Sequence, residues 1–199
     1  MADTVIYGGT FNPPHIAHKM IMELLAADKE TERLLVIPTF VPPHKEYVAQ
    51  VDDIHRLNMC RLAAKGIKNA AVSDIELRRG GKSYTVDTLE QLEKQYGNSS
   101  FAVACGGDML ITLDTWKNYP KLIKTAKIIA LYRQGTDEAK FGDAIKMIEN
   151  DGGRVKVINV SLPRVASKDI RSLIKAGEPV DEYIPFEVME YIKENKLYL

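Results

Sequence analysis

The sequence has few of the features that mark secreted and membrane proteins. Its 199 residues include only two cysteines, Cys60 and Cys105, which form no Cys-x-x-Cys pair and no Cys/His metal spacing. We therefore expect no disulfide framework, and the reducing cytoplasm is the expected location. No apolar run approaches the roughly 18 residues that a membrane span needs, and the first residues lack the basic and apolar regions of a signal peptide. We expect no membrane partner.

The sequence also lacks an excess of charge of either sign. Lys and Arg together number 27, Asp and Glu together also number 27, and the formal net charge at pH 7 is zero. A dedicated nucleic-acid-binding protein needs a large basic surface, so we expect no nucleic-acid partner. The balance is uneven along the chain: residues 161–177 carry four cations against one acid, whereas residues 178–199 carry two against six. The sequence therefore predicts positive charge gathered at one cleft.

Apolar segments of strand length alternate with segments of helical period, which predicts an α/β fold. The predicted strands are Val5–Tyr7, Leu34–Ile37, Ala70–Ser73, Phe101–Cys105, Ile128–Tyr132 and Val155–Val160. The predicted helices are His15–Ala27, Ile54–Lys65, Val86–Tyr96, Phe141–Glu149, Ser167–Ala176 and Phe186–Glu194. Gly66 and Gly97 follow two of these helices, where a left-handed cap favours glycine. Between the fourth and fifth predicted strands we expect a short helix over Asp108–Leu113 and a loop over Trp116–Pro120.

Short connections between these elements fit a Rossmann-like, doubly wound parallel sheet flanked by helices. No internal repeat, low-complexity tract or long polar linker divides the chain. We therefore predict a single domain over residues 1–199, with a small helical C-terminal part over about residues 163–199. The sequence is compatible with an oligomer and does not fix its size.

The turn after the first predicted strand is the first place to look for a ligand, because open α/β sheets bind ligands at the carboxyl ends of their strands. It reads Gly8-Gly9-Thr10-Phe11-Asn12-Pro13-Pro14-His15. Two consecutive glycines let an anionic ligand approach the backbone and permit a positive φ. The prolines stiffen the entry to a helix whose free N–H groups suit phosphate. The turn matches neither G-x-G-x-x-G nor G-x-x-x-x-G-K-[ST], which argues against a nicotinamide-dependent oxidoreductase and a Walker-type NTPase.

The helix after this turn carries two histidines near its start. Its predicted apolar stripe consists of Ile16, Ala17, Met20, Ile21 and Leu24. His15 and His18 lie off this stripe and close together, three residues apart. This placement predicts that both donate hydrogen bonds to a ligand at the helix end, and an incidental surface pair is the alternative. No nearby Cys, Asp or Glu completes a metal site, so we expect no metal bound by the protein itself.

Gly8-Gly9-Thr10-Phe11-Asn12-Pro13-Pro14-His15-Ile16-Ala17-His18 resembles the G-G-[ST]-F-D-P-x-H-x-G-H signature of the nucleotidyltransferases that make dinucleotide cofactors, bacterial nicotinate-mononucleotide adenylyltransferases in particular. Asn12 replaces the usual Asp, which bears on any metal contact there, and Ala17 replaces the usual Gly. In that family the two histidines bind the phosphates of ATP. The resemblance therefore assigns ATP binding to Gly8, Gly9, Thr10, Phe11, His15 and His18.

A second basic segment opens the predicted helix Ser167–Ala176. Ser167 is the expected N-cap, Ile170, Leu173 and Ile174 are expected to face the core, and Arg171 lies one turn from Ser167. A helix start with several cations suits an anion, and an ordinary solvated basic face is the alternative. The segment resembles the family's second signature, [IV]-S-S-T-x-I-R, with Ala166 and Lys168 replacing the first Ser and the Thr. The resemblance adds Ser167, Ile170 and Arg171 to the ATP-binding residues, with Lys168 either on a phosphate or solvated.

Further stretches extend the resemblance over nearly the whole chain. The rigid turn before His44 and Lys45 implies that these two residues bind the mononucleotide phosphate, and a stiff exposed loop is the alternative. The segment Ser83-Tyr84-Thr85 precedes a helix, where Ser83 or Thr85 could act as a helix cap. The resemblance implies that Tyr84 and Thr85 also line the pyridine-carboxylate pocket.

Three more segments carry expected ligand contacts. Gly106 and Asp108 follow the fourth predicted strand, and Asp108 is expected either to accept from ribose hydroxyls or to cap a helix. Trp116 and Lys117 match the family's Thr-Trp segment, which implies stacking of the indole on the pyridine ring; packing in the core is the ordinary role of a lone Trp. Arg133 follows the fifth predicted strand and is expected either at ATP or in solvent.

The resemblance implies transfer of AMP from ATP to nicotinate mononucleotide, giving nicotinate adenine dinucleotide and pyrophosphate in NAD biosynthesis. His15, His18 and Arg171 are the expected catalytic residues, and Mg²⁺ is expected to arrive with ATP. A related enzyme would use nicotinamide mononucleotide or phosphopantetheine as the acceptor. A nucleotide-sensing module without catalysis, which Asn12 favours, and an α/β interaction scaffold are the alternatives from other classes.

Overall fold

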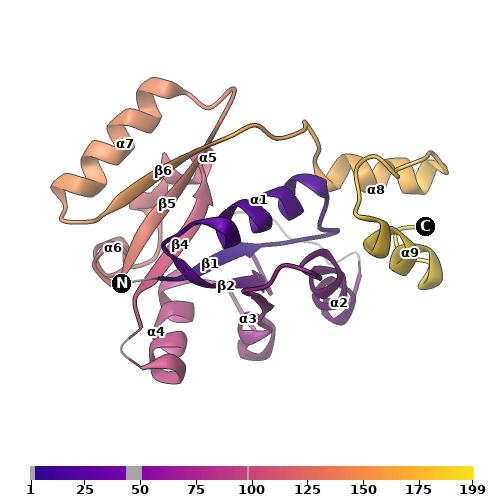
Figure 1. Cartoon of the computed structure of the whole chain (residues 1–199), viewed down its shortest axis with the longest axis horizontal. Helices are drawn as coiled ribbons and strands as arrows, with labels where there is room; N and C mark the ends of the chain where they lie inside the picture. Colours follow the sequence, from indigo (N-terminus) through magenta and orange to yellow (C-terminus); the bar gives the residue numbers. More distant parts are fainter. Residues whose placement is uncertain (1–2, 44–50, 98) are drawn as a thin grey trace.

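The computed structural model describes residues 3–43, 51–97 and 99–199, and its centre is one six-stranded parallel sheet (Figure 1). The strand order is β3-β2-β1-β4-β5-β6, and every neighbouring pair is parallel. The strands are β1 (Asp3–Gly9), β2 (Thr31–Pro38), β3 (Ala70–Val72), β4 (Phe101–Gly106), β5 (Ala126–Arg133) and β6 (Val155–Val160). This confirms the predicted Rossmann-like doubly wound sheet.

Helices cover both faces of the sheet. Strand residues alternate between two apolar clusters: Val5 and Val36 point into one, and Ile6 and Leu35 into the other. The first cluster receives α1 (Ile16–Ala27), α2 (Asp53–Ala63), α8 (Ser167–Ala176) and α9 (Phe186–Glu194). The second receives α3 (Ile75–Arg79), α4 (Thr85–Tyr96), α5 (Gly107–Leu110), α6 (Tyr119–Thr125) and α7 (Glu138–Asn150). A sheet buried on both faces explains why its strands are apolar nearly throughout.

The strand order reverses between β1 and β4, so the turns after these two neighbours lead to opposite sides of the sheet. Residues that end β1, β2, β4 and β5 meet at one edge of the sheet, which we call the carboxyl edge. There the ladder pairs Gly9 with Pro38, and Gly106 with Leu131. The opposite edge, where the strands begin, is the amino edge. The fold thus brings the turns singled out in the sequence to one edge.

The C-terminal helices pack on the same cluster as α1 and α2. Ile170 of α8 and Val188 of α9 are buried there, with Leu173 and Ile174 partly buried against it, as the sequence predicts. Figure 1 shows the start of α8 beside the start of α1, at the carboxyl edge. The C-terminal part therefore contributes directly to that edge.

The predicted strands and most predicted helices match observed elements to within a few residues, and Gly66 and Gly97 adopt the expected positive φ. Two helices, α3 and α6, were not predicted from the sequence. The expected loop Trp116–Pro120 is wrong at its end, because Tyr119 and Pro120 begin α6, where proline suits the first turn of a helix. The expected helix Asp108–Leu113 is α5 followed by a 3-10 turn over Leu113–Thr115. Within the described part of the chain, no helix is long and apolar enough to cross a bilayer.

Candidate functional site

The turn after β1 is built around a buried aromatic ring. Phe11 is 2% exposed and has a φ of 46°, so the left-handed backbone falls on Phe11, not on Gly8 or Gly9. A Cβ on Gly9 would lie 2.8 Å from Cζ of Phe11. Gly9 is therefore required by the close approach of this ring, whereas the space around Gly8 is open. The sequence predicted the approach of an anionic ligand and permitted a positive φ at the glycine pair, whereas in the structure the Phe11 ring approaches Gly9 and the positive φ is at Phe11.

The two predicted histidines stack on each other at the start of α1. Their ring centroids lie 3.6 Å apart, and the backbone N–H of His15 donates to Nδ1 of His18 at 3.2 Å. The edge of Phe11 packs against His18 with a centroid distance of 5.0 Å. Because Nδ1 of His18 accepts a hydrogen bond, its proton is on Nε2. The stacking fixes both rings relative to the turn.

The predicted apolar stripe of α1 is wrong in part. The buried residues are Ala17, Ile21, Met22 and Leu25, whereas Met20 and Leu24 are more than a third exposed. The buried face is rotated toward His18, because Tyr7 and Phe11 fill the space beneath that side of the helix. The histidines thus stand at the border of the core rather than on an outer face.

Burial keeps both imidazoles neutral at pH 7. Loss of solvent lowers the pKa of His15 to about 4. Desolvation, followed by repulsion from His15, also lowers the pKa of His18 well below its usual value. Among the described residues, Nδ1 of His15 is buried and has no hydrogen-bond partner. A buried polar atom in this state costs free energy, which is typical of a group that acts on a ligand.

Four side chains from distant elements hold the turn between the glycines and the histidines. Arg56 of α2 donates to the carbonyl oxygen of Thr10 at 3.0 Å. Arg171 of α8 donates to the carbonyl oxygen of Asn12 at 2.7 Å, and Ser167 donates to that of Pro13 at 2.8 Å. The hydroxyl of Tyr198 donates to Oδ1 of Asn12 at 2.6 Å. These contacts give the turn one defined shape.

Residues of the second predicted signature therefore contact the turn that carries the first. The expectation that Ser167 is an N-cap is wrong: Ala166 occupies that position, and the Ser167 hydroxyl turns outward to the Pro13 carbonyl. Ile170 is buried and anchors α8. Within the described residues, none of the four cations of segment 161–177 forms an ion pair; they are Arg164, Lys168, Arg171 and Lys175. Arg171, which contacts the turn before α1, therefore keeps its charge available to an anion there.

Asp108 and Arg133 lie together at the ends of β4 and β5. Their side chains form an exposed ion pair at 2.8 Å. Gly106, not Asp108, is the N-cap of α5, so the capping role considered for Asp108 is wrong. Gly107 packs tightly, since a Cβ there would lie 2.6 Å from Cγ2 of Thr136. The pair therefore presents one carboxylate and one guanidinium to solvent at the carboxyl edge.

A separate aromatic group gathers at the start of α4. Lys117 Nζ lies 4.7 Å from the ring centroid of Tyr84 and 2.8 Å from both carboxylate oxygens of Asp87. Trp116 is partly buried against the second apolar cluster. Tyr84 is the N-cap of α4 and no side chain caps this helix, so the capping role considered for Ser83 and Thr85 is wrong. Ser83 instead accepts a hydrogen bond from the Phe40 N–H at 2.8 Å.

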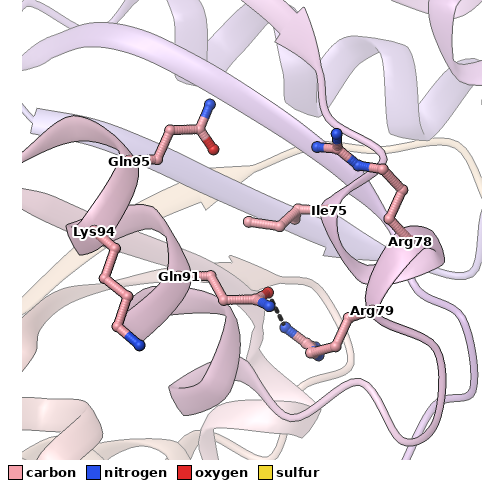
Figure 2. Close-up of a pocket in the computed structure, with 6 residues that line it drawn as sticks. All are labelled: Ile75, Arg78, Arg79, Gln91, Lys94 and Gln95. Atoms are coloured by element: carbon pink, nitrogen blue, oxygen red, sulfur yellow. Dashed lines mark hydrogen bonds between the residues drawn. The ribbon is translucent and has the colours of Figure 1, made fainter.

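Some predicted residues lie elsewhere. His44 and Lys45 are outside the described residues. The hollow in Figure 2 has a volume of about 300 Å³ and lies between α3 and the second half of α4, away from the predicted residues. Arg79 in this hollow donates to Gln91 at 2.8 Å and also to Thr88, so its guanidinium is already engaged.

Two residues of the carboxyl edge were missed by sequence reasoning. Arg56 is completely buried, and it lies on the same side of α2 as Met59, Cys60 and Ala63. An arginine in phase with buried positions was the signal that could have identified it. Tyr198 had no such signal, because its contact with Asn12 spans 186 residues.

The thiols and metal-ligating groups offer little chemistry. Burial raises the pKa of the Cys105 thiol to about 12 and also raises the pKa of Cys60, so neither is a thiolate at neutral pH. Across residues 3–43, 51–97 and 99–199, no three His, Cys, Asp or Glu side chains gather closely enough to hold a metal ion. The site is thus one of hydrogen-bond donors and cations.

The chain matches known proteins along most of its length. The model of the cytidylyltransferase-like family matches residues 6–189. A probable nicotinate-nucleotide adenylyltransferase of Symbiobacterium thermophilum is 34% identical, over 100% of this chain and 96% of the relative. One of Geobacter sp. strain M21 is 32% identical, over 98% of this chain and 97% of the relative.

Solved structures match the fold. The Plasmodium falciparum nicotinic acid mononucleotide adenylyltransferase complexed with NaAD has a TM-score of 0.80 and 19% identity, covering 100% of this chain and 98% of that one. A putative nicotinate-nucleotide adenylyltransferase from Vibrio parahaemolyticus has a TM-score of 0.71 and 20% identity, covering 100% and 96%.

Proposed function

The chain belongs to the cytidylyltransferase-like family, and we propose that it transfers the adenylyl group of ATP to nicotinate mononucleotide, giving nicotinate adenine dinucleotide and pyrophosphate in NAD biosynthesis. One observation supports this most strongly. The stacked pair His15 and His18 is joined through one turn, at the carboxyl edge, to Arg171, which forms no ion pair among the described residues. Such a gathering of donors suits a triphosphate.

The reaction needs positioning rather than a protein nucleophile. An oxygen of the mononucleotide 5′-phosphate attacks the α-phosphorus of ATP, and the bond from that phosphorus to the bridging oxygen breaks. The electron pair leaves on pyrophosphate, and the attacking phosphate is already an anion at neutral pH. Donors held in place stabilise the charge that grows on the phosphoryl and leaving oxygens.

The ATP side of this proposal rests on the anchored turn. His15 and His18, neutral in the free protein, each supply one N–H donor, and an arriving phosphate favours their protonated form. Arg171 uses one amino group on the Asn12 carbonyl and offers the rest of its fork to phosphate. We propose these three as the catalytic residues. The remaining ATP contacts proposed are Gly8, Gly9, Thr10, Phe11, Gly106, Asp108, Arg133, Ser167 and Ile170.

Two of those assignments need a specific role. Asp108 would accept hydrogen bonds from ribose hydroxyls. Arg133 pairs with one of its carboxylate oxygens, and the other oxygen is enough for this role. Ile170 is 1% exposed, so it supports α8 and contributes to the site through that helix.

The acceptor side is proposed around Tyr84. Tyr84, Thr85, Trp116 and Lys117 would receive the pyridine ring, supported by the contact of Lys117 with the Tyr84 ring. His44 and Lys45 are proposed for the mononucleotide phosphate from the sequence resemblance alone.

A divalent cation, which we propose to be Mg²⁺, would be held by the phosphates of ATP. The donor set fits this arrangement, since the described residues offer cations and N–H donors around the turn and gather no set of metal ligands. When bound, it would neutralise phosphate charge, and Mg²⁺ keeps several of its waters in such sites. Asn12, in place of the family's usual Asp, holds Tyr198 instead of supplying a carboxylate.

Several broader expectations remain proposals. We propose that residues 1–199 act as one domain, because Ser167 and Arg171 from the C-terminal part complete the turn after β1. A cytoplasmic location is proposed with the buried free thiols Cys60 and Cys105 as support. The absence of a nucleic-acid partner, and any oligomer, stay predictions.

An acceptor panel tests the function. The protein is incubated with ATP and Mg²⁺ and, in parallel, nicotinate mononucleotide, nicotinamide mononucleotide or phosphopantetheine, and products are identified by mass. We expect nicotinate adenine dinucleotide and pyrophosphate in equal amounts. A dinucleotide only with another acceptor would reassign the substrate. ATP binding without pyrophosphate from any acceptor would identify a nucleotide sensor and contradict the proposal.

A further inference from the structure

Arg56 is the most deeply buried charged side chain in the described part of the molecule. Its relative exposure is 0%, and it begins the second turn of α2 beside the carboxyl edge. One amino group, Nη1, donates to the Thr10 carbonyl at 3.0 Å and to the Thr39 carbonyl at 2.7 Å. The other, Nη2, pairs with Asp53. A single guanidinium thus joins the turn after β1 to the segment after β2.

These carbonyls lie where the sheet can no longer hold the two strands together. The β1–β2 register ends at the pair Gly9 and Pro38, and one more backbone bond follows, from the Thr39 N–H to the Gly9 carbonyl at 2.9 Å. Beyond this point the chains separate toward different helices. The Arg56 guanidinium bridges the two chains at Thr10 and Thr39, just beyond the last backbone hydrogen bond between them. It therefore extends the connection between β1 and β2 past the end of the sheet.

Stability alone is a poor explanation for a cation in this place. Removing a guanidinium from water is costly, and replacing buried ion pairs with apolar side chains of similar size is often neutral or stabilising. What an apolar side chain cannot do is fix two carbonyls at hydrogen-bond distance in one geometry. The arrangement therefore favours a role in the shape of the turn.

We propose that Arg56 is a positioning residue for ATP, which sets the turn Thr10–His15 against the segment after β2. Arg56 has no exposed surface, so it acts through Thr10 and not on the substrate. Arg171, Ser167 and Tyr198 contact Asn12 and Pro13, in the second half of the same turn. Among these four side chains, Arg56 alone contacts its first half, at Thr10. The inference rests on the proposed function, because it assumes that this turn carries ATP.

The test compares Arg56→Met, Arg56→Lys and Asp53→Asn with the control Lys127→Met in the full chain. Lys127 is also mostly buried and has two carboxylate partners, but it lies at the amino edge. ATP affinity is measured by calorimetry, KM for ATP and kcat by pyrophosphate release, and backbone mobility by hydrogen exchange of residues 8–15.

We expect Arg56→Met to weaken ATP binding about tenfold and to lower kcat/KM about 100-fold, since small displacements of a positioning group have effects of this size. Arg56→Lys should recover part of the loss, and Asp53→Asn should show a few-fold loss in the same direction. Exchange in residues 8–15 should rise in the Arg56 variants. Lys127→Met, with a comparable loss of thermal stability, should bind ATP within twofold of the wild type.

Equal ATP affinity and equal exchange in Arg56→Met and Lys127→Met would make Arg56 a purely structural residue and overturn the proposal. If Arg56→Met does not fold, wild-type ATP affinity in both Arg56→Lys and Asp53→Asn would overturn it as well. A wild-type protein that binds ATP but adenylylates no acceptor contradicts the proposed function only. The ATP comparison would still decide the role of Arg56.

Discussion

The two edges of the sheet hold their charged side chains in opposite ways. At the amino edge, Lys127 lies 2.6 Å from Asp3 and 3.2 Å from Glu30. Lys156 lies 2.9 Å from Asp28 and 3.0 Å from the same Glu30. Each cation there faces two carboxylates, and because Glu30 is shared, the two lysines are matched by three carboxylates. Both lysines are therefore already engaged by acidic side chains.

At the carboxyl edge, three of the four side chains that hold the turn after β1 bind neutral groups only, whereas the fourth, Arg56, also pairs with Asp53. Arg171 and Ser167 donate to backbone carbonyls, and Tyr198 donates to the amide oxygen of Asn12. A carbonyl orients a cation without cancelling its charge, whereas a carboxylate does both. The comparison teaches that one sheet can pair its cations with carboxylates at one edge and orient a cation on a backbone carbonyl, as the proposed anion binding requires, at the other.

The largest expected effect breaks the carboxyl edge alone. His18→Gln keeps a side chain of similar size but removes the imidazole donor from the stacked pair. We expect kcat/KM to fall about 10²- to 10³-fold, as for removal of one preorganised donor from a transition state. Pyrophosphate release measures this. Lys127→Met serves as the control, and full turnover by His18→Gln would contradict the assignment of His18 to the phosphates.

The second prediction distinguishes the two edges by the pH range in which each loses its contribution to stability. The pKa of His15 is about 4 in the folded protein and about 6.5 when exposed, so the unfolded chain binds the extra proton between these values. Stability is therefore complete above pH 6.5 and falls by about 3 kcal/mol as the pH drops to 4. Urea unfolding at a series of pH values measures this. The drop should be smaller in His15→Gln.

The amino edge should respond only in stronger acid. Burial tends to raise the pKa of Asp3, but hydrogen bonds from Lys127 and Ser100 outweigh it and hold the pKa below 3.8. A lowered carboxylate pKa gives stability that is present above pH 4 and lost as the pH falls further. Because the lowered pKa of His18 adds to the loss in the same range, His15→Gln should keep part of the drop, and a drop between pH 6.5 and 4 that is undiminished in this variant would show that this separation is wrong.

The third prediction breaks the amino edge. Lys127→Met leaves Asp3, 3% exposed, without its cation, and we expect the free energy of unfolding to fall by about 2 kcal/mol. Activity at a temperature where the variant is folded should stay within twofold of the wild type. Denaturant unfolding and pyrophosphate release provide the two measurements. A tenfold loss of activity would mean that the edges are coupled.

The smallest expected effect concerns Tyr198. Tyr198→Phe removes the hydrogen bond to Asn12 and keeps the ring, and we expect a loss of about 1 kcal/mol in stability with a two- to fivefold rise in KM for ATP. Thermal unfolding and steady-state kinetics measure both. A change in stability without any change in KM would place Tyr198 outside the anchoring of the turn.

The sequence predicted elements that depend on local pattern. Helices Ser167–Ala176 and Phe186–Glu194 were predicted with their observed bounds, because apolar periodicity is a local property. Helix α3, with five residues, is shorter than the window in which a period can be recognised. Helix α6 was missed because Pro120, which lies in its first turn, was interpreted as a loop residue.

Site geometry was less predictable, because it depends on contacts between distant residues. The sequence and the family resemblance singled out His15 and His18, but their lowered pKa values come from burial in the folded chain, where Tyr7 and Phe11 pack against His18. Ser167 was expected to cap its own helix, yet its hydroxyl contacts Pro13, 154 residues away. No local pattern carries that information.

The hydrogen bond between Asn12 and Tyr198 also has a consequence for synthesis on the ribosome. The two partners are separated by 186 residues, so the segment around Asn12 emerges long before Tyr198 has been translated. Chains fold from the N-terminal side during synthesis, and contacts of large sequence separation form last. The nascent polypeptide therefore completes its sheet before this loop is locked, and the turn takes its full shape only after Tyr198 has been translated.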